Sequence, residues 1–173
     1  MSRILVTFHS RSGNTRRIAQ ALARRLHADL DEIRIVQPLK GPLGYAMCAI
    51  EAIACLTPAL RPAGKDPAAY DLVVIGTPVW FWSLSSPVRS WLAGHRVGTR
   101  RVAFFCTMGA SGASRVFATM QSLAGRKPVA TLALTERELR DGADRKIDAF
   151  VSSLASRREQ ARAVPAPVVH ASA

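Results

Sequence analysis

The sequence predicts an α/β fold, a three-layer sandwich in which a five-stranded parallel sheet carries helices on both faces. Short, nearly continuous apolar runs such as Ile4–Phe8 and Leu72–Ile75 are typical of strands buried on both sides. Five strand patterns alternate with amphipathic helical patterns, and this alternation favours a parallel sheet. A chain of 173 residues, 49% of them hydrophobic, is long enough for one such domain and too short for two.

The first strand–helix unit is predicted at the start of the chain. Ile4–Phe8 is the strand, and a polar segment with a glycine follows it at Ser10–Thr15. Leu30–Val36 alternates between apolar and polar residues and is therefore predicted as a weaker strand. Between them, a helix to about His27 is predicted by apolar residues at four-residue spacing, which are Ile18, Leu22 and Leu26.

A long crossover and the central strand come next. Gln37–Ala69 contains several Pro and Gly residues, which predict loops around a helix at Tyr45–Leu56 and irregular structure over Thr57–Pro67. Leu72–Ile75 is the clearest strand of the sequence. We expect it to end at the turn signal Gly76-Thr77-Pro78.

The following unit begins with Ser86 as a helix N-cap and Pro87 at the first helical position. Arg101–Thr107 is predicted as the next strand, and Met108–Gly112 as the loop after it. The helix that follows is predicted from one apolar face, formed by Val116, Phe117, Met120, Leu123 and Ala124.

The last strand is expected at Val129–Leu134. Thr135 and Glu138 have the spacing of a capping box, which predicts a helix that runs to about Ser156. The remaining residues are basic, lack aromatic side chains and contain two prolines, a composition that predicts disorder. We therefore expect one domain at residues 1–156 and a basic, disordered tail at residues 157–173.

The chain is strongly basic. Its 24 Lys and Arg residues against 12 Asp and Glu residues give a net charge of +12 and a pI near 11.1. The charges are scattered and no aromatic stripe accompanies them, so compositional bias explains them better than a nucleic-acid surface does. No segment reaches the ~20 apolar residues of a membrane span. Three cysteines fit neither a disulfide framework nor a metal site, and we expect a cytoplasmic protein.

The first strand is followed by a segment with the features of a phosphate-binding loop. Its hydroxyl groups can donate to phosphate oxygens, its glycine lets backbone N–H groups approach closely, and a helix N-terminus adds partial positive charge. An ordinary capped helix start is the alternative interpretation. The candidate residues are Ser10, Arg11, Ser12, Gly13, Asn14 and Thr15.

Two further segments follow strands and are expected at the same edge of the sheet, where open parallel sheets bind ligands. The aromatic residues of one segment can stack on a flat ring, or can cover the sheet edge or form a subunit contact in a homodimer. Small residues in the other segment allow close backbone approach to a planar ligand. The candidates are Thr77, Pro78, Val79, Trp80, Phe81 and Trp82 in the first, and Thr107, Met108, Gly109 and Gly112 in the second.

One phosphate and a large flat heterocycle would use all three segments, and FMN has this shape. Phe8–Thr15 resembles the flavodoxin phosphate loop, whereas Ile75–Trp80 and Phe105–Gly109 resemble the two loops that flank the flavin in that family. The resemblance implies a flavodoxin-like fold with strand order 2-1-3-4-5, and FMN as the cofactor. It places the phosphate in the first segment and the flavin ring between the other two.

Two departures from the family pattern bear on function. Relatives often carry Gly at the position of Trp82, and flavodoxin-like electron carriers are typically acidic, whereas a cationic chain favours acidic partners. The resemblance implies electron transfer with a redox partner protein, or reduction of quinone-like small molecules by NAD(P)H. His9 is expected to be structural. The alternative is a flavin-free module of the same fold that binds an acidic partner or nucleic acid.

Overall fold

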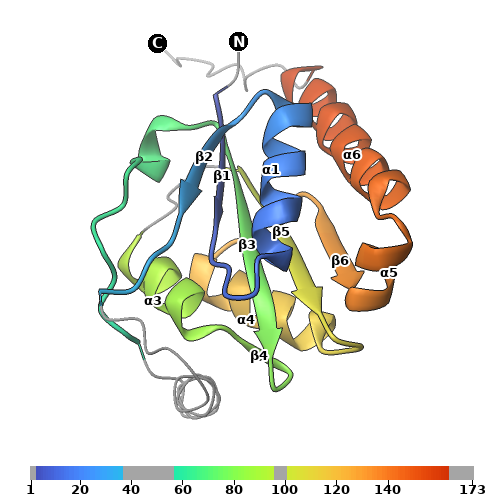
Figure 1. Cartoon of the computed structure of the whole chain (residues 1–173). Coiled ribbons are helices and arrows are strands. Elements are labelled where there is room, and N and C mark those ends of the chain that lie inside the picture. Colours follow the sequence, from blue (N-terminus) through green and yellow to red (C-terminus); the bar gives the residue numbers. More distant parts are fainter. Residues whose placement is uncertain (1–2, 37–56, 96–100, 164–173) are drawn as a thin grey trace, which may run out of the picture.

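Five parallel strands form the sheet in the order β2-β1-β3-β5-β6 (Figure 1), in a computed structural model that describes residues 3–36, 57–95 and 101–163. A short strand, β4, adds an antiparallel pairing to the end of β3. Without β4, this is the order that the flavodoxin resemblance implied, and the predicted fold class is confirmed. The strands are β1 (Ile4–Phe8), β2 (Asp29–Glu32), β3 (Leu72–Trp80), β4 (Ser83–Leu84), β5 (Arg101–Met108) and β6 (Thr131–Thr135).

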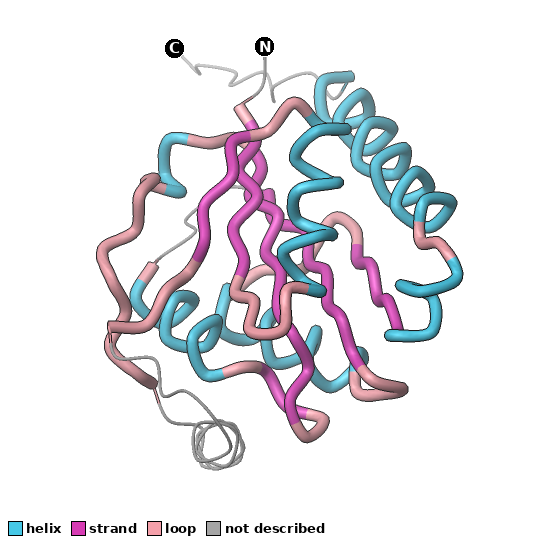
Figure 2. Tube along the Cα trace, in the orientation of Figure 1, coloured by secondary structure: helices cyan, strands magenta, loops and turns pink. Residues whose placement is uncertain are grey.

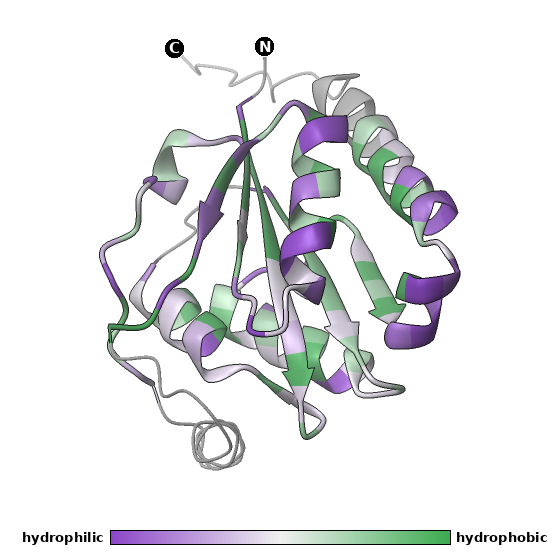
Figure 3. Cartoon of the chain, in the orientation of Figure 1, coloured by the Kyte–Doolittle hydropathy of each residue, from purple (hydrophilic) through white to green (hydrophobic). Residues whose placement is uncertain are grey.

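Helices cover both faces of the sheet because neighbouring strand residues point to opposite sides (Figures 1 and 2). The helices are α1 (Asn14–Leu26), α5 (Glu136–Asp141) and α6 (Asp144–Ala163) on one face, and α3 (Ser86–Gly94) and α4 (Ala113–Ala124) on the other. Val6 packs on the face that α1, α5 and α6 cover, and Leu5 packs on the opposite face, which α3 and α4 cover. In Figure 3, hydrophobic residues dominate β3 and β6, whereas β2, α1 and α5 carry many hydrophilic residues.

Four strand predictions need correction. The last strand, β6, spans Thr131–Thr135 rather than Val129–Leu134, and β5 runs one residue past Thr107 to Met108. β2 spans Asp29–Glu32 rather than Leu30–Val36, because β1 ends at Phe8, opposite Glu32, and offers later residues no register partner. β3 does not end at the predicted turn but continues to Trp80. The missing N–H of Pro78 is tolerated near the end of a strand, and the two residues beyond it pair with β4.

The helix predictions also change in detail. Ser85, not Ser86, is the N-cap of α3. The capping box of Thr135 and Glu138 is confirmed, but it begins the short helix α5, and the single predicted helix is divided into α5 and α6 near Gly142, whose φ is +105°. The helix predicted at Tyr45–Leu56 lies outside the described residues.

Helix α6 extends past its predicted end at Ser156. It continues to Ala163, so residues 157–163 are helical rather than part of a disordered tail. The physical reason is their composition of Arg, Glu, Gln and Ala, all of which favour a helix, and the first proline comes only at Pro165. The prediction for residues 164–173 lies outside the described part of the chain.

Candidate functional site

The ends of β1, β3 and β5 meet at one edge of the sheet, and the three predicted segments follow these ends (Figure 1). From β1 the chain passes to β2 on one side, whereas β3 lies on its other side. The strand order therefore reverses beside β1, and such a switch point is where open α/β sheets bind ligands. Of the predicted residues, Arg11, Ser12 and Gly109 are exposed there, and Gly13, Asn14, Met108 and Gly112 are half-buried.

The first segment leaves the start of α1 open toward solvent. Gly13 is the N-cap residue, has a φ of +94° and supplies no side-chain cap. The backbone N–H of Arg16 donates to Oγ of Ser10 over 3.2 Å, but the other amide groups of the first turn have no intrahelical partner. A Cβ built on Gly13 would meet no atom within 4 Å. A phosphate monoester fits this arrangement, because open space lies beside N–H groups at a helix N-terminus.

Thr15 links the first segment to the third. Its side chain is buried, and its Oγ1 lies 2.8 Å from Oγ1 of Thr107, the residue before the last in β5. Thr15 and Asn14 belong to the first turn of α1 rather than to a loop, and Thr107 and Met108 belong to β5. The structure thus assigns the Thr15 hydroxyl to holding the two segments together. Ser10 is buried as well, and its Oγ accepts the bond from Arg16.

The second segment is a tight hairpin rather than a loop. Trp80 of β3 faces Ser83 of β4, so only Phe81 and Trp82 connect the strands. Their φ angles are +46° and +57°, the left-handed values that a type I′ hairpin turn requires and that Asn-Gly normally supplies. Both side chains remain exposed, by 50% and 61%. Two bulky aromatic residues in this conformation store strain, a feature that clusters at functional sites.

Trp82 is held against the third segment. Its indole Nε1 donates to Oγ of Ser111 over 2.9 Å. A Cβ built on Gly112 would lie 3.2 Å from Cα of Trp82 and 2.9 Å from Cγ1 of Val79, so only glycine permits this approach. The φ of Gly112 is +113°, which adds a second reason for glycine there. The hairpin and the loop before α4 therefore form one wall.

The other predicted residues of the second segment support the hairpin from inside. Thr77 is fully buried, and its Oγ1 donates to the carbonyl of Pro78 over 2.9 Å. The same Oγ1 lies 2.9 Å from Oγ of Ser85, the residue before α3. Because its single hydroxyl proton goes to the carbonyl, Ser85 is the donor of the second bond. Thr77 is committed to these contacts, and Pro78, Val79 and Trp80 are half-buried.

His9 joins the first segment to the second. Its ring meets the indole of Trp80 edge-on, with 5.7 Å between centroids and an interplanar angle of 89°. Nδ1 lies 2.9 Å from the carbonyl of Ile33, and because a carbonyl only accepts, Nδ1 carries the proton. Burial lowers the pKa of His9 below its ordinary 6.5, and positive charges at Arg11 and Arg16 act in the same direction against the raising effects of Glu32 and the Ile33 carbonyl. The neutral imidazole is therefore favoured.

The lowered pKa of His9 gives stability a pH dependence. Above about pH 6.5 the residue is neutral in both folded and unfolded chains, and its contribution is fully present. Below 6.5 the unfolded chain binds the proton first, so the free energy of unfolding falls as the pH falls through the folded pKa. We expect His9→Asn, which keeps a donor for Ile33, to show a flatter dependence in urea titrations from pH 7.5 to 5. Equal slopes for both proteins would contradict this.

Sequence reasoning missed the residues that connect the segments. Ser111 and Ser85 bond to Trp82 and Thr77, but nothing in their sequence neighbourhood indicates these partners. Cys106 is a buried free thiol, and burial raises its pKa to about 12. It therefore stays protonated and is no nucleophile. Cys48 and Cys55 lie outside the described residues.

Comparison with known proteins identifies a family model and similar folds. The family model described as flavodoxin matches residues 3–146. A flavoprotein from Lactobacillus acidophilus, solved in complex with FMN, is 20% identical with a TM-score of 0.68, over 82% of this chain and 98% of that chain. A flavoprotein from Bacteroides eggerthii is 23% identical with a TM-score of 0.68, over 83% and 97%. At such identities the likeness shows the fold.

More distant likeness reaches a flavodoxin from Streptococcus pneumoniae, which is 14% identical with a TM-score of 0.56, over 90% of this chain and 99% of that chain. No curated protein matches the sequence. Within residues 3–36, 57–95 and 101–163, no helix has the length and hydrophobicity to cross a bilayer. In the same ranges, no three His, Cys, Asp or Glu side chains gather as a metal site.

Proposed function

Because the chain belongs to the flavodoxin family, we propose that it is an FMN-dependent redox protein that takes hydride from NAD(P)H and reduces quinone-like small molecules. FMN is the cofactor that this family membership brings, and the described residues fit it. The bound flavin supplies the redox chemistry, and the protein supplies binding, orientation and exclusion of water.

The observation that carries the proposal is the network that fixes the phosphate cradle relative to the aromatic wall. Thr15 and Thr107 connect the first and third segments, and Trp82 and Ser111 connect the second and third. A ligand held at both ends needs this fixed separation, whereas a simple helix cap or an edge cover does not. The strained φ angles of the exposed hairpin residues support the proposal as well, since strain of this kind clusters at functional sites.

Each segment has a distinct role in this proposal. The amide groups around Gly13, together with the exposed hydroxyl of Ser12, bind the phosphate. The backbone at Gly109 lies exposed beside the end of β5 and allows a planar ring to approach. Trp82 covers one side of the ring site, and its hydrogen bond to Ser111 fixes the indole so that it excludes water there.

The positive net charge of the chain favours small acceptors and NAD(P)H over a basic redox partner protein. The net charge of +12 would repel basic partners, which acidic carriers attract. An electron carrier with an acidic protein partner is the second form of the proposal.

Steady-state kinetics separate the two forms. The protein is reconstituted with FMN, and NADPH or NADH oxidation is followed at 340 nm with and without a soluble benzoquinone. We expect quinone-dependent turnover that disappears when the flavin is removed. A protein that binds FMN but shows no turnover with either nucleotide would support the carrier. A protein that takes up no FMN would contradict both forms and favour the flavin-free binding module.

A further inference from the structure

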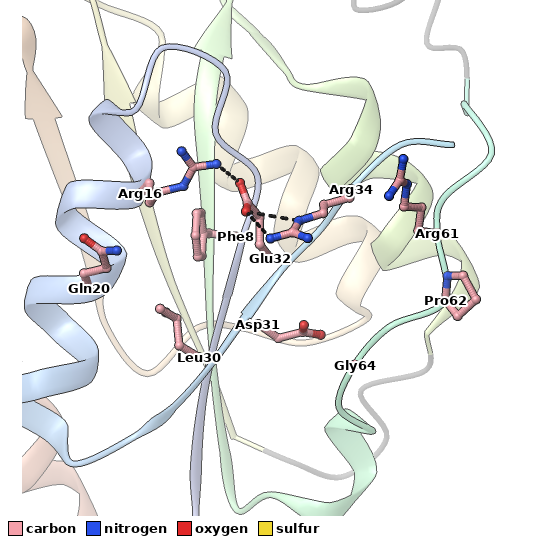
Figure 4. Close-up of a pocket in the computed structure, with 10 residues that line it drawn as sticks. All are labelled: Phe8, Arg16, Gln20, Leu30, Asp31, Glu32, Arg34, Arg61, Pro62 and Gly64. Carbon is pink, nitrogen blue, oxygen red and sulfur yellow. Dashed lines mark hydrogen bonds and ion pairs between the residues drawn. The ribbon is translucent and has the colours of Figure 1, made fainter. Parts of the chain in front are cut away.

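A cavity lies beside the phosphate cradle, on the β2 side of the sheet (Figure 4). Its volume is about 490 Å³, within the range of small-molecule sites. Three arginines line the cavity. Arg16 belongs to the first turn of α1, Arg34 follows β2, and Arg61 lies in the segment that runs beside Arg34. Leu30 and Pro62 add apolar surface. Phe8 at the end of β1 also lines the cavity, but no residue of the three segments of the flavin site does.

The arginines are arranged around one carboxylate. Figure 4 shows Glu32 between the guanidinium groups of Arg16 and Arg34. Arg16 contacts one carboxylate oxygen at 2.5 Å, and Arg34 contacts the other through Nε at 3.2 Å and through its terminal nitrogen at 3.1 Å. Each guanidinium has five N–H donors, so both retain donors beyond those that Glu32 accepts. Glu32 therefore orients the two arginines without using up their capacity.

Arg61 supplies a further cation. Its backbone N–H donates to the carbonyl of Arg34 over 2.8 Å, which fixes the two residues side by side. Within the described ranges, the guanidinium of Arg61 has no hydrogen bond or ion pair. The carboxylate of Asp31 also lines the cavity, next to Gly64, where a Cβ would lie 3.1 Å from its Oδ1. Three guanidinium groups thus face two carboxylates, and the cavity favours an anion.

The position of the cavity indicates which anion. In dinucleotide-binding α/β folds, the adenosine ribose lies at the carboxyl end of the second strand, and a nearby arginine accommodates its 2′-phosphate. Glu32 ends β2, and Arg34 follows it. The cavity adjoins the cradle through Arg16, whose backbone N–H bonds to Ser10. Arginine forks match phosphate geometry, and the apolar surface of Leu30 and Pro62 suits a purine base.

We propose that this cavity binds the phosphorylated ribose of an adenine nucleotide, and that NADPH supplies it. The link to NADPH rests on the proposed function, whereas the ligand chemistry, a ribose phosphate monoester next to adenine, rests on the cavity itself. The same chemistry occurs at the 3′ position in coenzyme A. Either ligand would place its phosphate between Arg34 and Arg61.

Calorimetric titration of the FMN-loaded protein tests the proposal with 2′,5′-ADP, 3′,5′-ADP and 5′-AMP as probes. We expect 2′,5′-ADP to bind about 10-fold more tightly than 5′-AMP, the effect of roughly one charge-assisted phosphate contact. The Arg34→Ala/Arg61→Ala variant should lose that preference. The Arg137→Ala/Arg145→Ala variant, with the same change of charge on the exposed surfaces of α5 and α6, should keep it.

Each outcome decides one part of the proposal. Equal binding of 2′,5′-ADP and 5′-AMP, or equal losses in both double variants, would overturn the site. Tighter binding of 3′,5′-ADP than of 2′,5′-ADP would support the cavity and overturn its assignment to NADPH. The FMN absorbance of each protein is read separately, and the titrations are repeated on flavin-free protein. Failure of the flavin proposal is thereby distinguished from failure of this one.

Discussion

Replacing Gly76 by alanine is expected to destabilise the fold by about 2–3 kcal/mol and to weaken flavin binding with it. A Cβ on Gly76 would lie 2.0 Å from Cζ of Phe105, whose ring covers this residue from the neighbouring strand. Phe105 is fully buried in the packed core and cannot move without displacing its neighbours. Gly76 also accepts the N–H of His9 over 3.2 Å, so the disturbance reaches the start of the phosphate cradle.

Urea unfolding with a matched control measures this effect. Gly94→Ala is the control, because a Cβ at Gly94 meets no atom within 4 Å. The free energy of unfolding should fall for Gly76→Ala and change little for Gly94→Ala. In a Phe105→Leu background the Gly76→Ala change should cost less, because the ring that it meets is absent. Equal costs in both backgrounds would show that Phe105 is not the reason for glycine.

Replacing Phe81-Trp82 by Asn-Gly should stabilise the protein and weaken its hold on FMN at the same time. The type I′ turn needs positive φ at both positions, which Asn and Gly adopt with little strain. We expect a gain of about 1 kcal/mol, or roughly 2–4 °C in Tm. The ring site loses the indole that bonds to Ser111, and the affinity for FMN should fall about 10-fold.

Two measurements separate these effects. Thermal unfolding of the flavin-free proteins reports the strain, and fluorescence titration with FMN reports the ring contact. Phe81→Asn alone is the control, since it relieves one strained position and keeps Trp82. It should gain part of the stability with FMN affinity nearly unchanged. A double variant that is less stable than the parent, or that binds FMN equally well, would contradict the assigned role of the hairpin.

The layers of the fold could be predicted because continuous apolar runs in the sequence indicate buried strands. Ile4–Phe8 and Leu72–Ile75 lie where the sequence places them, with the latter extended. β2 was misplaced because it is a polar edge strand, and its limits are set by the length of β1 rather than by its own residues. The extension of β3 was hidden by Pro78, whose turn propensity is outweighed by pairing with β4.

In the candidate site, too, local residue patterns could be predicted from the sequence, whereas contacts between distant residues could not. The residue types of the cradle and of the aromatic segment could be recognised from the sequence, and the structure brings them to one edge. Their connections could not be predicted, because Thr15 and Thr107, or Trp82 and Ser111, are far apart in sequence. The cavity around Glu32 could not be predicted for the same reason, since its arginines come from three separate segments.

The most direct test of the central claim, a phosphate held at the start of α1 beside an aromatic wall, compares FMN with riboflavin. The two ligands share the ring system and differ in the phosphate alone, so their affinity ratio isolates the cradle. Two charge-assisted hydrogen bonds from the cradle predict that FMN binds at least about 100-fold more tightly in fluorescence titrations. Equal affinities, or no binding of either flavin, would contradict the account.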